Sequence, residues 1–448
     1  MASKSKRART VKQRNLVKDF MYWAIAVFAV KLIIIGNVQG GAWLGADGEN
    51  YLKGSDALTR DGFFSTEPFL SYWPSGYPLF IYVLEFFASG WHLYALTIIQ
   101  SAVFSYAVYF LAKNLLKTKL VKFTYVIFLI ILLNPTLSLT SLAIGYESFA
   151  ASGLLLIIAL IIKSVEMSRK SVFSQELFMA SLISLAVSMF QPRFLLATFI
   201  TFAIWTLMLY GKKLFVVPLI LSLLIVSIAP AILIFRNYHA MGFTAISTNL
   251  GGTMNLGAGD KASGAYTFKD SGVPCTEITG NAALKDRHLV GCVIDWYLSN
   301  PVKATELAFN KSKFFWSPWY GPEANGSMAR NPWLFINPLK DIAESTPDGS
   351  KLVFGGMGKI ISYGWIASQI ALLFYGFIVF IRFGRFEKIL GNLILGQVLI
   401  SWLISIGTLG DHRQRLPTMG MSLILQAVAL RKIIKSDGPK VASPSSIR

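Results

Sequence analysis

The stretch 20-FMYWAIAVFAVKLIIIGNV-38 decides the fold of this chain. An α-helix needs about 20 predominantly apolar residues to cross a bilayer, and this run has that length. A basic segment, residues 1–19, precedes the run, and no small-residue cleavage site follows it. We therefore expect an uncleaved first membrane span, in which the Lys31 side chain reaches toward the outer interface.

The rest of the chain is similarly apolar. Of its 448 residues, 54% are hydrophobic and 15% are charged, and the mean hydropathy is +0.54, which is too apolar for a soluble domain of this length. The sequence predicts an all-α polytopic membrane protein with about ten transmembrane helices. The predicted spans lie near 20–38, 91–112, 123–142, 147–162, 177–192, 194–210, 214–235, 359–381, 389–408 and 417–430.

The basic residues orient these spans. With the N-terminus inside, the cytoplasmic segments hold 24 of the 42 Lys and Arg and 5 of the 23 acids, a balance of +19 that equals the net charge of the chain. This positive-inside pattern predicts an integral plasma (inner) membrane protein with both termini cytoplasmic. A pI near 9.8 would also fit a nucleic-acid binder, but six separate segments share the charge, which argues against a nucleic-acid partner.

The orientation divides the chain into five parts. The first outer loop contains a short apolar stretch, 76–90, which carries Glu85 and is expected to form an interfacial helix. The larger outer loop precedes the last three spans. The parts are a cytoplasmic tail at 1–19, an N-terminal transmembrane module at 20–235 with its outer loop at 39–90, a large extracytoplasmic loop at 236–358, C-terminal transmembrane helices at 359–430 and a second cytoplasmic tail at 431–448.

Ionisable residues gather at the outer ends of the predicted spans. An unpaired charge at membrane depth costs roughly a few kcal/mol, so we expect these residues to line a shared wet cavity. Carboxylates can take a proton from a hydroxyl, and arginines can bind a phosphate through paired hydrogen bonds. Charged helix ends are also common in polytopic proteins. The residues are Asp47, Glu49, Glu147, Arg193, Arg236, Asp411, His412, Arg413 and Arg415.

Three stretches together resemble a known family. DGENYLKGSDALTRDGFFSTEPFLSYWPSGYPLFIYVLEFF (47–87), APAILIFRNYHAMGFTAISTNLGGTMNLGAG (229–259) and GDHRQRLP (410–417) occur in the order of similar motifs in GT-C class polytopic membrane glycosyltransferases. The resemblance is strongest to bacterial relatives of dolichyl-phosphate-mannose protein mannosyltransferases. Those relatives commonly carry a tighter Asp-Glu pair, whereas here Gly48 separates the two acids.

The resemblance implies a GT-C-like fold and a hexosyl- or pentosyltransferase that acts in cell-envelope glycosylation. Such an enzyme would transfer a sugar from a polyprenyl-phosphate donor to a hydroxyl of a lipid, glycan or protein at the extracytoplasmic face, by an inverting single displacement. The resemblance establishes no cofactor, and a divalent metal held by Asp47 and Glu49 is left open. The expected roles are Asp47 as general base, Glu49 or Glu147 as orienting acids, Arg193, Arg236, Arg413 and Arg415 on the phosphate, and Tyr51 and Tyr77 as sugar-stacking or loop-anchoring rings.

The sequence leaves two other functions, and the formation of one disulfide bond, undecided. An outer-face polysaccharide polymerase or ligase would also have ten or more spans and an arginine-bearing loop. A lipid-glycan flippase or transporter would instead show a repeated half, broken helices and buried charge near the bilayer midplane. Cys275 and Cys292 share the large outer loop, where an oxidising compartment would permit a disulfide, but sequence does not establish their distance.

Overall fold

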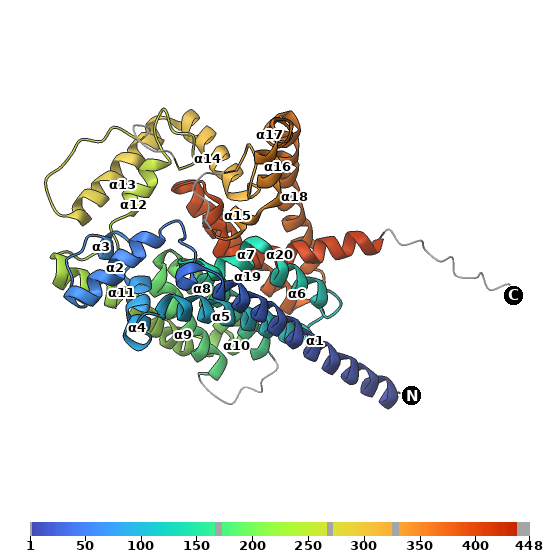
Figure 1. Cartoon of the computed structure of the whole chain (residues 1–448). Helices are drawn as coiled ribbons and strands as arrows, with labels where there is room; N and C mark the ends of the chain where they lie inside the picture. The colour runs from blue at the N-terminus through green and yellow to red at the C-terminus, as the bar shows by residue number, and fades with distance from the viewer. Residues whose placement is uncertain (1, 166–172, 267–271, 325–330, 437–448) are drawn as a thin grey trace.

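The computed structural model describes residues 2–165, 173–266, 272–324 and 331–436, and every regular element in these ranges is a helix. Figure 1 shows a bundle of long helices with shorter helices gathered around one side. Several of the long helices are apolar enough to cross a membrane. The prediction of an all-α polytopic membrane protein is confirmed at this level.

Seven segments within the described residues are long and apolar enough to span a bilayer. An eighth crossing is formed if α6 (Thr124–Leu133) is joined to α7 (Pro135–Leu139) and η2 (Thr140–Leu142), which follow it after a bend of 53°. Proline cannot continue a helix without a kink, and Pro135 stands at this bend. The seven are Gln13–Gly36 of α1 (Ala2–Gly36), α5 (His92–Leu115), α8 (Glu147–Ser164), η3 (Pro192–Phe194) with α10 (Leu195–Leu214), α11 (Val216–Met241), α17 (Pro347–Phe354) with α18 (Gly356–Phe380), and α19 (Arg385–Gly407).

The predicted count of ten spans therefore exceeds the seven or eight helices that meet this test. Each predicted span does coincide with a helix or with the bent pair. The two remaining helices differ from full spans for separate reasons. α9 (Gln175–Phe190) is apolar but only 16 residues long, and α20 (His412–Ser436) carries charged residues at both ends.

The helices pack around α8, whose spanning window is 83% buried inside the protein. α8 contacts α5, α9 and α20, while α1 packs on α5 at the edge of the bundle. Lys31 of α1 is only 2% exposed, and its Nζ donates to Ser141 Oγ at 3.0 Å and lies 4.3 Å from the ring centroid of Phe104. Lys31 is therefore buried inside the protein, and its reach toward the outer interface stays a prediction.

The two predicted outer loops are largely helical. The apolar stretch expected at 76–90 forms α4, although its position in a membrane interface stays a prediction. Figure 1 places α2, α3, α12 and α13 on the left of the bundle, away from the N-terminal end of α1 and the C-terminal end of α20. The shorter elements are η1 (Gln39–Gly41), α2 (Gly48–Asp61), α3 (Phe69–Tyr72), α4 (Gly76–Phe87), α12 (Leu250–Leu256), α13 (Ala282–Ser299), α14 (Pro301–Trp316), α15 (Trp333–Ile336) and α16 (Pro338–Ser345).

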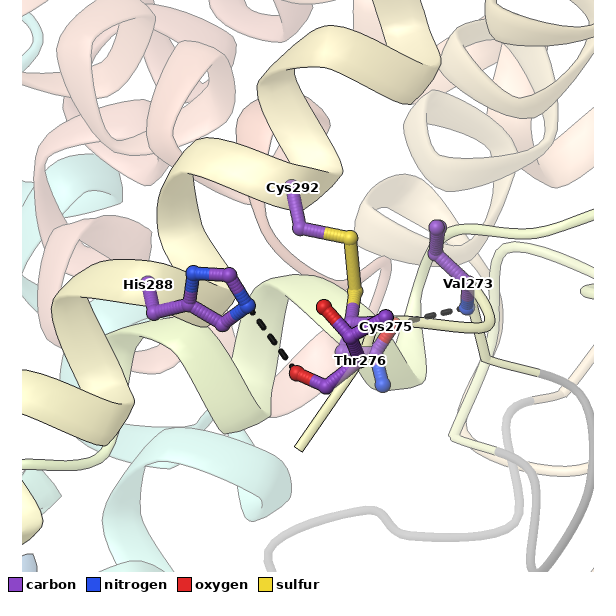
Figure 2. Close-up of a disulfide and its surroundings, with 6 residues drawn as sticks. Val273, Cys275, Thr276, His288 and Cys292 are labelled. Atoms are coloured by element: carbon purple, nitrogen blue, oxygen red, sulfur yellow. Dashed lines mark hydrogen bonds between the residues drawn. A yellow bond between two sulfur atoms is a disulfide. The ribbon is translucent and has the colours of Figure 1, made fainter. Parts of the chain in front are cut away.

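A disulfide joins Cys275 to Cys292, so the pairing that the sequence left open is formed. The two Cα atoms are 6.1 Å apart, and the bond ties an extended segment to the middle of α13. Figure 2 shows His288 of α13 beside it, with the ring Nε2 3.0 Å from the carbonyl oxygen of Thr276. The bond therefore fixes α13 to the chain that precedes it.

Candidate functional site

One short backbone contact brings the first outer loop to the start of α8. The Trp43 amide donates to the carbonyl of Leu142 at 2.9 Å, and the Ile144 amide donates to the carbonyl of Trp43 at 2.8 Å. Both segments continue for a few residues beyond this isolated parallel bridge. Asp47 then precedes α2, and Glu147 is the first residue of α8. Two acids that are 100 positions apart are therefore held in the same region.

Buried side chains fix the turn that carries Glu147. Gln100 of α5 donates through Nε2 to the carbonyls of Ser141 and Ala143, at 3.1 and 3.0 Å. The Tyr77 hydroxyl donates to Gln100 Oε1 at 3.2 Å and accepts the amide of Gly145 at 2.8 Å. Tyr77 therefore supports the turn and does not line the cavity below, in contrast to the sugar-stacking role that was one of its two predicted functions.

Arg413 of α20 lies between the two acids. Its Nη1 is 2.5 Å from Asp47 Oδ2, and its Nε forms an ion pair with Glu147 Oε1. The guanidinium carbon is also 5.6 Å from the centroid of the Tyr146 ring. The exposed fractions of these side chains are 15% for Arg413, 22% for Asp47 and 5% for Glu147. Three residues that the sequence predicted to share a site therefore form one mostly buried cluster.

A cavity of about 880 Å³ opens beside this cluster. Tyr51, which is almost fully buried, lies on its wall, and burial followed by the charge of Asp47 raises the pKa of this phenol well above its usual value. The lining mixes acids, amides and aromatic rings. It comprises Ala46, Asp47, Asn50, Tyr51, Pro68, Phe69, Tyr72, Trp73, Tyr146, Gln191, Asn249, Thr253, Leu256, Tyr266, Leu409, Asp411, Arg413 and Gln414.

Asp411 is the second carboxyl group that lines this cavity, beside Asp47. Its Oδ1 accepts the backbone N–H of Arg413 at 2.9 Å, and the residue is 4% exposed. Burial, with smaller contributions from the charges of Asp47 and Glu147, raises the pKa of Asp411 to about 6. Sequence reasoning placed Asp411 on the outer face but gave it no role. Its position two residues before Arg413 was the available signal.

A second, mostly apolar groove of about 550 Å³ lies on the other side of the same turn. Arg415 reaches this groove, where its Nη2 donates to Gln369 Oε1 at 2.9 Å and its guanidinium carbon lies 4.4 Å from the Trp316 ring centroid. The Nε atom of Arg415 is buried without a hydrogen-bond partner in the described residues. The apolar walls include Pro135, Trp319, Trp333, Leu339, Ile342, Leu352, Val353, Ile361, Trp365, Met419 and Leu423.

Arg193 lies next to the cluster without lining the cavity. Its guanidinium carbon is 5.7 Å from the Tyr146 ring centroid and 5.0 Å from that of Phe194. Its Nε and Nη2 atoms are buried and have no hydrogen-bond partner among the described residues. The Tyr146 ring is therefore in contact with two arginines, Arg413, which lines the cavity, and Arg193, which does not.

Two of the predicted residues are not brought into the site. Glu49 has a 67% exposed side chain and pairs with Lys53 at 2.7 Å on the surface of α2. Arg236 is buried elsewhere, where it donates to the carbonyls of Phe63 and Ser65 and holds the loop after α2. The structure therefore separates Glu49 from the metal-binding and catalytic role predicted beside Asp47, and Arg236 from the predicted phosphate site. Within the described residues, no group of three or more His, Cys, Asp or Glu side chains is arranged to hold a metal ion.

No protein-family model matches the chain, and a comparison with curated proteins finds no significant relative.

Proposed function

We propose that this protein transfers a sugar from a polyprenyl-phosphate donor to a hydroxyl of a lipid, glycan or protein, at the extracytoplasmic face of the plasma membrane. In this reaction the acceptor oxygen attacks the anomeric carbon. The bond between that carbon and the phosphate oxygen breaks, and polyprenyl phosphate leaves with the electron pair. One displacement of this kind inverts the anomeric configuration.

The observation that carries the proposal is the division of chemistry across the turn 411–415. Asp411 and Arg413 line the polar cavity, whereas His412 and Arg415 line the apolar groove, and the two linings share no residue. A lipid-linked sugar has the same two parts, a greasy chain and a polar head. The turn would therefore lie at the bond between them.

The apolar groove suits the lipid chain and phosphate of the donor. Binding sites for apolar ligands are mostly hydrophobic, with a few placed polar groups that fix orientation. Arg415 supplies such a group, and its buried Nε atom, which has no hydrogen-bond partner in the described residues, would gain one from a phosphate oxygen. Arg193 lines neither space but lies beside Tyr146 of the polar cavity, and its two buried nitrogens without a partner in the described residues make it the second candidate for the phosphate.

The polar cavity suits the sugar and its acceptor. Tyr72 and Trp73 offer flat apolar ring faces, and Asn50, Gln191 and other side chains offer hydrogen bonds. A carboxylate at this cavity must take the proton of the acceptor hydroxyl. The sequence assigned that role to Asp47, whose carboxylate is already paired with Arg413.

The disulfide supports the proposed location. Disulfides form and persist in oxidising compartments, and the bond between Cys275 and Cys292 lies in the large loop that the charge pattern places outside.

The test is a donor screen with purified protein in lipid nanodiscs. Radiolabelled polyprenyl-phosphate sugars are supplied singly with a mixed acceptor extract, and we expect one donor to be consumed with an inverted linkage in the product. Arg415→Met should lower donor turnover at least tenfold, while Arg60→Met, which alters an exposed arginine paired with Asp61, should not. Movement of lipid or solute across a proteoliposome membrane without turnover of any donor would instead establish the flippase or transporter. Consumption of pyrophosphate-linked oligosaccharides alone would establish the polymerase or ligase.

A further inference from the structure

The three carboxyl groups around Arg413, those of Asp47, Glu147 and Asp411, have unequal partners. The Arg413 guanidinium binds the carboxylates of Asp47 and Glu147 directly, through Nη1 and Nε. Asp411 receives only the backbone N–H of Arg413, and no ion pair of the described residues includes it. The carboxylate least engaged by a cation is therefore Asp411, not the acid after the first span.

The other charged groups near Asp411 do not change this imbalance. Lys311 of α14 packs against Gly410, but its Nζ donates to the Tyr297 hydroxyl at 2.6 Å. His412 lines the apolar groove and not the polar cavity. Its Nδ1 donates to the carbonyl of Ser317 at 2.9 Å. Asp411 therefore faces two like charges, Asp47 and Glu147, and one cation, Arg413, which is already paired with both of those acids.

This setting matters because a general base works best when its pKa lies near the working pH. Burial, with the charges of Asp47 and Glu147, raises the pKa of Asp411 to about 6, so the group is mostly ionised at pH 7 yet binds a proton far better than an ordinary aspartate. An ion pair has the opposite effect on a carboxylate, since a neighbouring cation favours the charged form.

We propose that Asp411 removes the proton from the acceptor hydroxyl, and that Asp47, together with Glu147, positions Arg413 at the cavity. This inference rests on the proposed sugar transfer. As the acceptor oxygen forms its bond to the anomeric carbon, its proton passes to the Asp411 carboxylate. The donor phosphate departs with the electrons of the broken glycosidic bond, and the proton on Asp411 returns to water after product leaves.

The experiment compares the pH dependence of kcat/KM for transfer in the wild type, Asp411→Asn and Asp47→Asn, with the identified donor. The wild-type rate should fall tenfold per pH unit below about pH 6, as a single base is protonated. Asp411→Asn should lower the rate roughly 10²- to 10⁴-fold. The residual rate should no longer show the fall toward low pH, the acid limb of the profile. Asp47→Asn should lower the rate but keep the limb. Glu306→Gln, an exposed acid paired with Lys303, is the matched control and should leave the profile unchanged.

Folding of the variants is checked in the same samples. Asparagine can still accept the Arg413 N–H, and it removes a charge that burial disfavours, so Asp411→Asn should be at least as stable to heat as the wild type at pH 7. An acid limb that survives in Asp411→Asn, or that disappears in Asp47→Asn, would overturn the inference while leaving sugar transfer intact. If Asp411→Asn does not fold, the Asp47→Asn profile alone decides. A wild type that consumes no donor at any pH would overturn both proposals.

Discussion

Arg413 is shared by two acids, so its replacement should be among the most damaging single changes in the bundle. Arg413→Met keeps much of the side-chain length but leaves Asp47 and Glu147 without their partner. Removing one member of a buried ion pair typically costs about 3–5 kcal/mol, because a charge is left buried and uncompensated. Asp47 is 22% exposed and can regain water, whereas Glu147 is 5% exposed and cannot. We therefore expect a loss near the lower end, about 3 kcal/mol.

Thermal unfolding in detergent, followed by tryptophan fluorescence, measures this loss. An unfolding entropy of about 2.1 cal/mol/K per residue gives roughly 0.9 kcal/mol per degree for 448 residues. A loss of about 3 kcal/mol then lowers Tm by about 3 °C. Arg60→Met is the matched control, because Arg60 is 66% exposed, and its Tm should not change.

A triple variant separates the loss of charge balance from the loss of packing. Asp47→Asn and Glu147→Gln, added to Arg413→Met, remove the two stranded charges and keep the shapes of both side chains. The large cost of breaking a buried ion pair comes from the uncompensated charge, and the triple variant leaves none, so it should recover part of the lost Tm. A triple variant less stable than Arg413→Met, or an Arg413→Met protein as stable as the control, would refute the electrostatic account of this cluster.

Three further outcomes follow from the contacts. Cys275→Ser opens a loop of sequence separation 17 and should cost about 3 kcal/mol, seen as faster amide exchange in α13. Arg236→Met removes hydrogen bonds to the Ser65 segment and should lower stability by about 1–3 kcal/mol, with less than a twofold change in the donor KM, since the arginine lies outside both cavities. Glu49→Gln breaks only the surface pair with Lys53 and should change the transfer rate less than twofold. A tenfold fall in transfer for Glu49→Gln would return that acid to the site.

The helical fold could be predicted because its signal is local. A run of apolar residues long enough to cross a bilayer needs no information from distant parts of the chain. The bend at Pro135 and the short α9 lie inside equally apolar runs, so hydropathy counted each as a full span. The burial of Lys31 could not be predicted for a different reason. Its partner Ser141 lies 110 residues away, on a turn whose position only the folded bundle defines.

The sequence could predict the candidate site only as far as the side of the membrane on which each residue lies. Charge orientation placed Asp47, Glu147 and Arg413 on one face, and the structure joins all three. Charge orientation did not distinguish between neighbouring residues of one helix. Glu49 lies two positions after Asp47 in the first turn of α2, and residues two apart on a helix do not face the same way. Nor could charge orientation single out Asp411, whose raised pKa depends on its burial in the folded protein.

The geometry of α20 bears on the choice between sugar transfer and lipid transport. His412 and Arg415 stand three positions apart, so they share one face of the helix and one groove, while Arg413 points to the other cavity. The two linings share no residue, so the polar and the apolar spaces are distinct. A flippase needs a continuous path for the whole head group. Here the residues of a single helical turn stand between the two spaces, an arrangement that favours breaking one bond across the turn over moving a lipid-linked glycan past it.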